Sequence, residues 1–104
     1  MIITTTDSIP NKKIVEMLGI AKGNTIRARG LGGDISASIK TLVGGEIGAY
    51  VTTMEEAREE AVERMKKNGE KLGADAIVNV RFTTSSVMQG AAEILAYGTA
   101  VTLK

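Results

Sequence analysis

The amino-acid sequence predicts an α+β fold in which a small antiparallel sheet is packed by one long helix and a short helix. Three observations predict it: a charged segment with an apolar stripe at helical spacing, two apolar strand-like segments after it, and β-branched residues concentrated before it. The chain has 104 residues, which is the size of one domain. We therefore expect residues 1–104 to form a single domain.

Two extended segments are predicted in the first thirty residues. Ile2 to Thr6 is a β-branched run that ends at the turn-forming sequence DSIPN. Lys13 to Arg29 mixes β-branched residues with glycine and asparagine, so we expect one long, bent or bulged strand with arms at Ile14 to Ala21 and Thr25 to Arg29. A helical turn at Ile14 to Leu18 is the alternative.

A glycine cluster, GLGGD at Gly30 to Asp34, then breaks the chain. Asp34 can cap a short helix from about Ile35 to Val43, whose apolar residues have helical spacing. The cluster matches neither the GxxxxGK[ST] nor the GxGxxG pattern, and an acidic residue stands where a phosphate would bind. We interpret it as a turn.

The long helix has two candidate starting points. Thr53 with Glu56 three residues later is a capping-box signature, which would start the helix directly after Thr53. The apolar stripe instead continues in phase backwards through Tyr50 and Ile47, which favours a start at about Glu46. We prefer the longer helix, because phase-matched burial outweighs a capping pair worth about 1 kcal/mol.

We expect this helix to end at Gly73. Its acidic and basic residues lie mostly in different halves. Carboxylates occupy the first half and basic residues the second, as the helix dipole favours. The carboxylates fan around the outer surface, whereas a hard cation needs converging oxygens, so we interpret them as a solvated face. They are Glu55, Glu56, Glu59, Glu60 and Glu63.

Two strands are predicted after the helix. Ala76 to Thr84 alternates, which should place Val78, Val80 and Phe82 on one face of the sheet. Ala92 to Leu103 has one face of mostly small residues and an opposite face that is also apolar. The small face is Ile94, Ala96, Gly98 and Ala100, and the opposite face is Leu95, Tyr97, Val101 and Leu103. One helix covers only one face of a small sheet, so the second apolar face predicts another layer, most simply another copy of the chain.

Composition excludes several classes of function. The sequence has no cysteine and no histidine, which excludes disulfides, thiolate or imidazole metal sites, cysteine nucleophiles and histidine bases. A formal charge of +1 without a basic arm makes nucleic acid an unsuitable partner. There is no apolar run long enough for a membrane span and no signal peptide, so we expect a cytoplasmic protein without a membrane partner.

Three residues are candidates for ligand binding. On a helix that starts at Glu46, a helical wheel places Glu46 on one edge of the apolar stripe, Tyr50 near its centre and Arg58 on the other edge. Near a subunit interface they could form a polar network or line a small pocket, and we favour the network. The sequence indicates no catalytic residue, no metal ligand and no cofactor.

Four segments in this order carry a resemblance over nearly the whole chain. They are VGGEIGAY at Val43 to Tyr50, AREEA at Ala57 to Ala61, LGADAIVNVRF at Leu72 to Phe82, and YGTAV at Tyr97 to Val101. In this combination the chain resembles the YbjQ family of small bacterial proteins, which is labelled heavy-metal-binding. The resemblance implies an α+β subunit like that of dodecin, a ring-like homopentamer and an uncharacterised function.

The heavy-metal label fits this sequence poorly. Soft metals select thiolate and imidazole, and the soft donors here are methionine thioethers, mostly within apolar patterns. They are Met17, Met54, Met65 and Met88. The first hypothesis is therefore a non-enzymatic oligomeric binding or scaffold module. A metal-binding or metal-sensing protein is the second, and an enzyme with an intersubunit site around Glu46 is the third.

Overall fold

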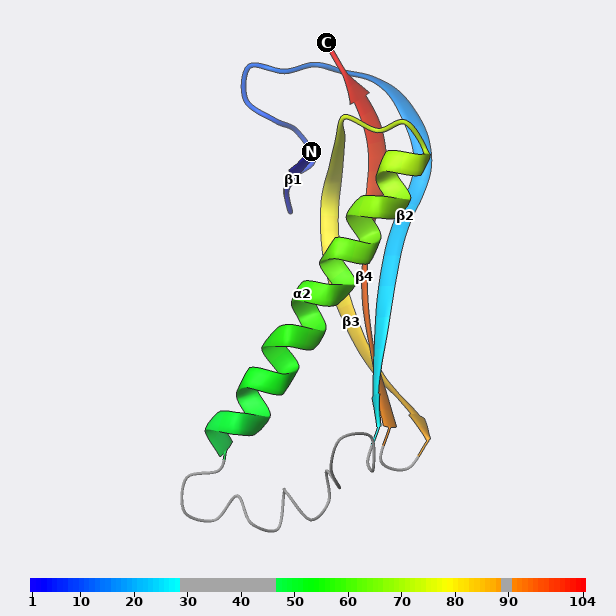
Figure 1. Ribbon diagram of the computed structural model, residues 1–104. Coiled ribbons are helices and arrows are strands. Elements are labelled where there is room, and N and C mark those ends of the chain that lie inside the picture. The colour runs from blue at the N-terminus through cyan, green and yellow to red at the C-terminus, as the bar shows by residue number, and fades with distance from the viewer. Residues whose placement is uncertain (29–46, 89–90) are drawn as a thin grey trace.

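The computed structural model describes residues 1–28, 47–88 and 91–104, which form a four-stranded sheet with one helix against one face (Figure 1). The elements are β1 (Ile2–Ile3), β2 (Ile14–Ala28), α2 (Ile47–Lys71), β3 (Ala76–Met88) and β4 (Ala91–Leu103). The strand order is β1-β3-β4-β2, so β4 is a central strand and β2 lies at an edge. The predicted short helix from Ile35 to Val43 and the glycine cluster before it lie outside the described residues.

The sheet is mixed, so the prediction of an antiparallel sheet is wrong for its first strand. β1 runs parallel to β3, with Ile2 opposite Ala76, whereas β4 is antiparallel to both β2 and β3. Thr4 continues the parallel pairing, because its amide donates to the Ile77 carbonyl at 3.0 Å and its carbonyl accepts from the Val80 amide at 3.0 Å. A strand of two residues has no pattern from which its direction could be predicted.

Helix α2 begins at Ile47, which confirms the longer of the two predicted helices. Its C-terminal end is closed as predicted at Gly73, whose φ of +85° is costly for residues with a Cβ. The Gly73 amide donates to the Glu70 carbonyl at 3.0 Å, and the Ala74 amide donates to the Gly69 carbonyl at 3.0 Å. This pair of hydrogen bonds is a Schellman motif, which satisfies carbonyls that the last helical turn leaves free.

Strand β2 is one continuous strand whose irregularities lie in its first third. Register shifts occur between Ile14 and Glu16 and between Met17 and Gly19, and Gly19 has a φ of +119°. The long bulged strand is therefore confirmed, but Gly23 does not interrupt it. Gly23 is buried under α2 instead, where the absence of a side chain lets the helix approach.

Strand β3 contains a bulge at Asn79 that reverses its faces. Asn79 has a φ of +55°, and the register with β4 shifts between Val78 and Arg81. Ile77 and Val80 therefore both face α2, while Val78 packs on the opposite side of the sheet. The prediction that Val78 shares a face with Val80 is wrong, because an inserted residue changes the alternation of side chains.

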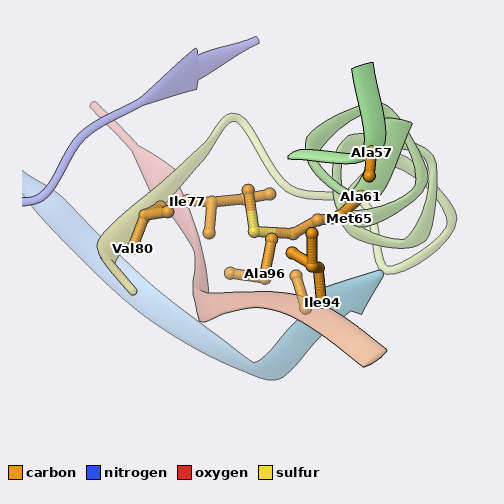
Figure 2. Packing of buried hydrophobic residues seen from close by; sticks show 9 residues of the cluster. Ala57, Ala61, Met65, Ile77, Val80, Ile94 and Ala96 are labelled. Carbon is orange, nitrogen blue, oxygen red and sulfur yellow. The ribbon is translucent and has the colours of Figure 1, made fainter. Parts of the chain in front are cut away.

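The main core lies between α2 and the sheet and consists largely of small side chains (Figure 2). Ala57, Ala61 and Met65 form the buried stripe of the helix. Figure 2 shows the Met65 side chain extending from α2 toward Ile77 and Ala96. The other buried members of this cluster are Ala21, Val80, Ile94 and Ala100. Small residues at the contact bring the helix close to the strands.

The two apolar faces predicted for β4 are both present. Ile94, Ala96 and Ala100 are buried under α2, and a Cβ on Gly98 would lie only 2.7 Å from Cγ2 of Ile77. On the other side of the sheet, which we call the outer face, Val101 is buried in a second cluster with Ala76 and Val78. Ile9, Ile14 and Leu103 pack against this cluster. The second cluster covers one end of the outer face.

The described residues leave much of their apolar surface exposed. Twelve large hydrophobic side chains are exposed, against six that are buried: Met65, Ile77, Val78, Val80, Ile94 and Val101. The Cα radius of gyration is 16.7 Å, compared with about 13 Å for a compact domain of 100 residues. Figure 1 shows why the molecule is long: α2 runs obliquely, with its first turns apart from the strands. Residues 1–28, 47–88 and 91–104 therefore bury few large apolar side chains for an arrangement of this length.

Candidate functional site

One flank of α2 lies along the edge strand β2. Glu60, Arg64 and Asn68 are spaced four residues apart, so their side chains share this flank, and we call them the edge row. The Arg64 guanidinium donates to the Asn24 carbonyl at 2.6 Å, and the Lys22 amide donates to Oδ1 of Asn68 at 2.9 Å. The helix thus bonds directly to the backbone of β2.

Glu60 connects the edge row to both elements. Its carboxylate accepts a hydrogen bond from Arg27 of β2 at 2.9 Å and forms an ion pair with Arg64 one helical turn away. The hydrogen bond from Arg27, together with the positive charges of Arg64 and Arg27, lowers the pKa of Glu60 against a smaller opposing effect of desolvation. Glu60 is therefore ionised over the whole neutral range.

The other flank of α2 and strand β3 line an open groove of about 460 Å³. Phe82 of β3 lies in it with 48% of its surface exposed, and Val62 adds a second apolar side chain. Arg58, Glu59 and Glu63 of α2 complete the lining. The groove is suited to contact with an apolar or aromatic group beside charges.

A second groove, of about 440 Å³, lies beside the edge row. Asn24 spans part of it, because its Nδ2 donates to Oε2 of Glu93 at 2.8 Å and so ties β2 to β4. The lining residues are Lys22, Gly23, Asn24, Asn68, Glu93 and Leu95. The Asn24–Glu93 bond and the bond from the Lys22 amide to Asn68 use polar groups of this groove to hold β2 against β4 and α2, which gives the groove a structural explanation.

Of the three predicted ligand-binding residues, Arg58 is the one whose side chain the structure describes. Arg58 is exposed and lines the groove with Phe82. Tyr50 lies in the first turn of α2, and Glu46 lies outside the described residues. Arg58 therefore lies in the same groove as Phe82. The association of Glu46, Tyr50 and Arg58 stays a prediction.

Sequence reasoning missed two features of these surfaces. It did not single out Asn68, although an asparagine near the end of a helix with a following glycine is an unfavourable choice unless its side chain bonds elsewhere. It placed Phe82 on the face of Val80, which the structure confirms, but it did not identify Phe82 as a half-exposed side chain beside α2. The importance of Asn68 was detectable from helix propensity, whereas the exposure of Phe82 depends on where β3 passes α2.

The residues do not fit a heavy-metal site. The whole sequence lacks thiolate and imidazole donors, and within residues 1–28, 47–88 and 91–104 no three acidic side chains cluster as metal ligands. Three of the methionine thioethers lie apart: Met65 is buried in the core, whereas Met17 is paired with Val101 and Met88 with Ala91, near opposite ends of the sheet. The described helix is not apolar enough to cross a membrane.

Comparisons with known proteins assign the chain to a group whose biochemistry is undetermined. The model of the YbjQ family, described as "Putative heavy-metal-binding", matches residues 1–104. A UPF0145 protein of Thermosipho africanus is 62% identical and one of Archaeoglobus fulgidus is 57% identical, each over 100% of this chain and 96% of the relative. Since relatives occur in archaea, the group is wider than the bacterial one expected. Neither name specifies a reaction.

A solved structure has a similar fold. The crystal structure of a protein of unknown function from Pediococcus pentosaceus, assigned to the DUF74 family, has a TM-score of 0.69 against this chain. The match covers 100% of this chain and 98% of the other, at 18% sequence identity. At that identity the similarity establishes the shared α+β architecture and nothing about activity.

Proposed function

Because the chain belongs to the YbjQ family, whose UPF0145 relatives have names without a reaction, we propose that it is a non-enzymatic module that works as a homo-oligomer. The proposed assembly is a ring of five subunits that binds a small ligand or partner, or acts as a scaffold. The absence of an enzyme name among the relatives reported above is weak support for the non-enzymatic part.

The observation that carries the proposal is the outer face of the sheet. Met17, Ile20 and Tyr97 lie on it with 75%, 68% and 37% of their surfaces exposed. Ile26 follows Ile20 on the same face of β2 and is 50% exposed. Lys22 and Asn24 lie between Ile20 and Ile26 on this face, so the exposed apolar side chains are interspersed with polar ones. Exposed apolar side chains rimmed by polar residues are typical of a protein interface. Burying it against other copies would extend the small second core formed by Ala76, Val78 and Val101.

Two different lateral surfaces of the subunit support a cyclic arrangement. β2 forms one side of the sheet, while β3 forms the other beyond the short stretch paired with β1. A ring of more than two subunits needs such an interface, in which one surface of a copy meets a different surface of the next. The number five comes from the family resemblance.

The groove with Arg58 and Phe82 is the proposed contact site of this module. It combines an exposed aromatic side chain with an arginine, a pairing that is common at protein interfaces and in sites for planar ligands. In the assembly it would be filled by a neighbouring subunit or by a small ligand held between subunits.

Native mass spectrometry of the protein purified from its own cells, together with sedimentation equilibrium at micromolar concentration, tests the proposal. We expect a single closed species of five subunits, and any retained ligand would appear as additional mass. A monomer that melts cooperatively at this concentration would show that the exposed apolar face is compatible with an isolated subunit. That result would reject the proposal.

A metal-binding or metal-sensing function is the alternative, and the description of the family model favours it. Elemental analysis and titration calorimetry with copper, zinc and magnesium test it. Because the chain lacks thiolate and imidazole donors, we expect no ion to bind more tightly than about 1 mM. Micromolar binding that survives a competing chelator would instead support the metal function.

An enzyme with an intersubunit site around Glu46 is the third possibility. It requires Glu46 to lie in a cleft between subunits, close to Tyr50 or Arg58. The location of Glu46 in a structure of the assembly tests this, and a Glu46 side chain in open solvent or bonded to backbone amides would reject it.

A further inference from the structure

Strand β2 has the features of an edge that invites pairing with another chain. It is 15 residues long and lies at the end of the sheet. Ile20 and Ile26, which flank its middle, are 68% and 50% exposed. Long apolar edge strands act as templates for further strands, and proteins normally block them. The sequence has no proline within β2 that would do so.

The middle of this edge is nevertheless occupied. Alternate residues of an edge strand turn both their amide and their carbonyl away from the sheet. In β2 these residues include Lys22 and Asn24, because the Lys22 amide bonds to Asn68 and the Asn24 carbonyl bonds to Arg64, both on α2. A strand added to β2 would need these same backbone groups. Two side chains of the edge row already use them.

The position of the edge row is fixed by contacts on both sides. Glu60 pairs with Arg64 within the helix and with Arg27 on the strand. Deeper in the same contact, the buried Thr25 hydroxyl donates to the Ala57 carbonyl at 3.0 Å. The helix therefore cannot shift away from the β2 edge without breaking several polar contacts together.

We propose that the edge row, Glu60, Arg64 and Asn68, closes β2 to strand pairing by a second copy of this chain. The side chains act as a cap: they satisfy outward-facing backbone groups and occupy the space beside them. Copies can then meet through side-chain surfaces, while growth of an open-ended sheet through the middle of β2 is blocked. This inference does not depend on the ring proposed above.

The test uses the full chain with the substitutions Arg64→Ala and Asn68→Ala combined. Sedimentation velocity and thioflavin T fluorescence would be measured over a range of protein concentrations. We expect large assemblies with intermolecular β-sheet to appear at a concentration roughly tenfold lower than for the unmodified chain. The reason is that the uncapped edge of β2 can pair with strands of other copies. The same onset concentration as the unmodified chain would overturn the inference.

Matched variants separate loss of the cap from loss of charge or fold. Lys67→Ala removes one positive charge from the same helix at an exposed site and should behave like the unmodified chain. Arg64→Lys with Asn68→Asp keeps a donor for the Asn24 carbonyl and an acceptor for the Lys22 amide, so it should restore the original onset. If Lys67→Ala formed large species at the same concentration as the double alanine variant, the cap would be rejected. The same holds if Arg64→Lys with Asn68→Asp did not restore the onset concentration of the unmodified chain.

A single-site comparison serves if the double variant does not fold. Asn68→Leu removes the acceptor but favours the helix, whereas Asn68→Asp keeps the acceptor. With cooperative melting in both, we expect strand-rich species only for Asn68→Leu, and equal behaviour would reject the inference. A monomeric unmodified chain would reject the ring but leave this comparison valid, so the two proposals fail separately.

Discussion

Gly23 of β2 lies against the backbone of α2, so that a Cβ at this position would stand 2.5 Å from the carbonyl oxygen of Ala61. The next contact along the strand is the bond from Thr25 to the Ala57 carbonyl, one helical turn earlier. Helix and strand thus meet backbone to backbone, with small residues on both sides. This close approach also brings the edge row within reach of the β2 backbone.

The substitution Gly23→Ala is expected to destabilise the fold. The added methyl group would clash with helix backbone, which cannot move aside as a flexible side chain could. Overpacking of this kind costs about 1–3 kcal/mol, and we expect the upper part of that range. Urea denaturation followed by circular dichroism measures it. Thr83→Ala, at an exposed position of β3, should change stability by less than about 1 kcal/mol.

Thr25→Val is expected to destabilise the fold by about 1 kcal/mol, because it removes a buried hydroxyl that donates to the helix while nearly keeping the shape. Thr25→Ser keeps the donor and serves as the comparison, although it loses a methyl group. Equilibrium denaturation measures both variants. If the valine variant were as stable as the unmodified chain, the hydrogen bond would contribute nothing net to folding.

Glu60 should make the stability depend on pH at the acid end. Its pKa in the folded chain is held below the ordinary value of 4.5, chiefly by the hydrogen bond from Arg27. The stabilisation is therefore present above that value and is lost as the pH falls through the folded-state pKa. We expect Glu60→Gln to be less stable than the unmodified chain at about pH 7, and the difference to shrink toward about pH 3.

Thermal melts across this pH range measure the effect, with Glu63→Gln as the control. Glu63 lies on the same helix and pairs with Lys66 at 3.3 Å, but its side chain is 63% exposed. Exposed pairs of this kind contribute little to stability. A difference for Glu60→Gln that stayed constant with pH would mean that its carboxylate charge has no role.

Charge placed on the outer face is expected to weaken the proposed assembly without unfolding the subunit. Ile20→Lys combined with Ile26→Lys adds two ammonium groups where the strand is exposed. Burying unpaired charge in an interface is strongly unfavourable, so we expect dissociation into smaller species by sedimentation, with unchanged far-ultraviolet circular dichroism. Lys12→Ile with Lys13→Ile is a control for altered charge. An intact ring in the first variant would place the interface elsewhere.

Elements with long repeating patterns were predictable from the sequence. The apolar stripe, which continues through Tyr50 and Ile47, correctly predicted that α2 begins before the capping pair of Thr53 and Glu56. This prediction was possible because the apolar residues recur at helical spacing over about seven turns. The two-sided apolar pattern of β4 was predictable for the same reason. Gly73 was identified as the end of the helix, since a left-handed residue there is a local requirement.

Features set by a single residue or by distant contacts were not predictable. The Asn79 bulge moves Val78 to the outer face, and asparagine tolerates positive φ in many loops that are not bulges. The direction of β1 depends on pairing between Ile2 and Ala76, which are far apart in the chain. Arg58 was chosen by its place on the helical wheel, but its neighbour Phe82 depends on where β3 passes α2.

The strand order has a consequence for biosynthesis. β4 is the last of the described strands along the chain, yet it separates β2 from β3 and pairs with both. When a ribosome makes the chain, β2 and β3 emerge before β4, the strand that lies between them. Ile14, for example, cannot pair until Leu103 has been synthesised. We expect the sheet to close only after translation has passed β4, so nascent chains stalled before Ala91 would lack it and depend on chaperones.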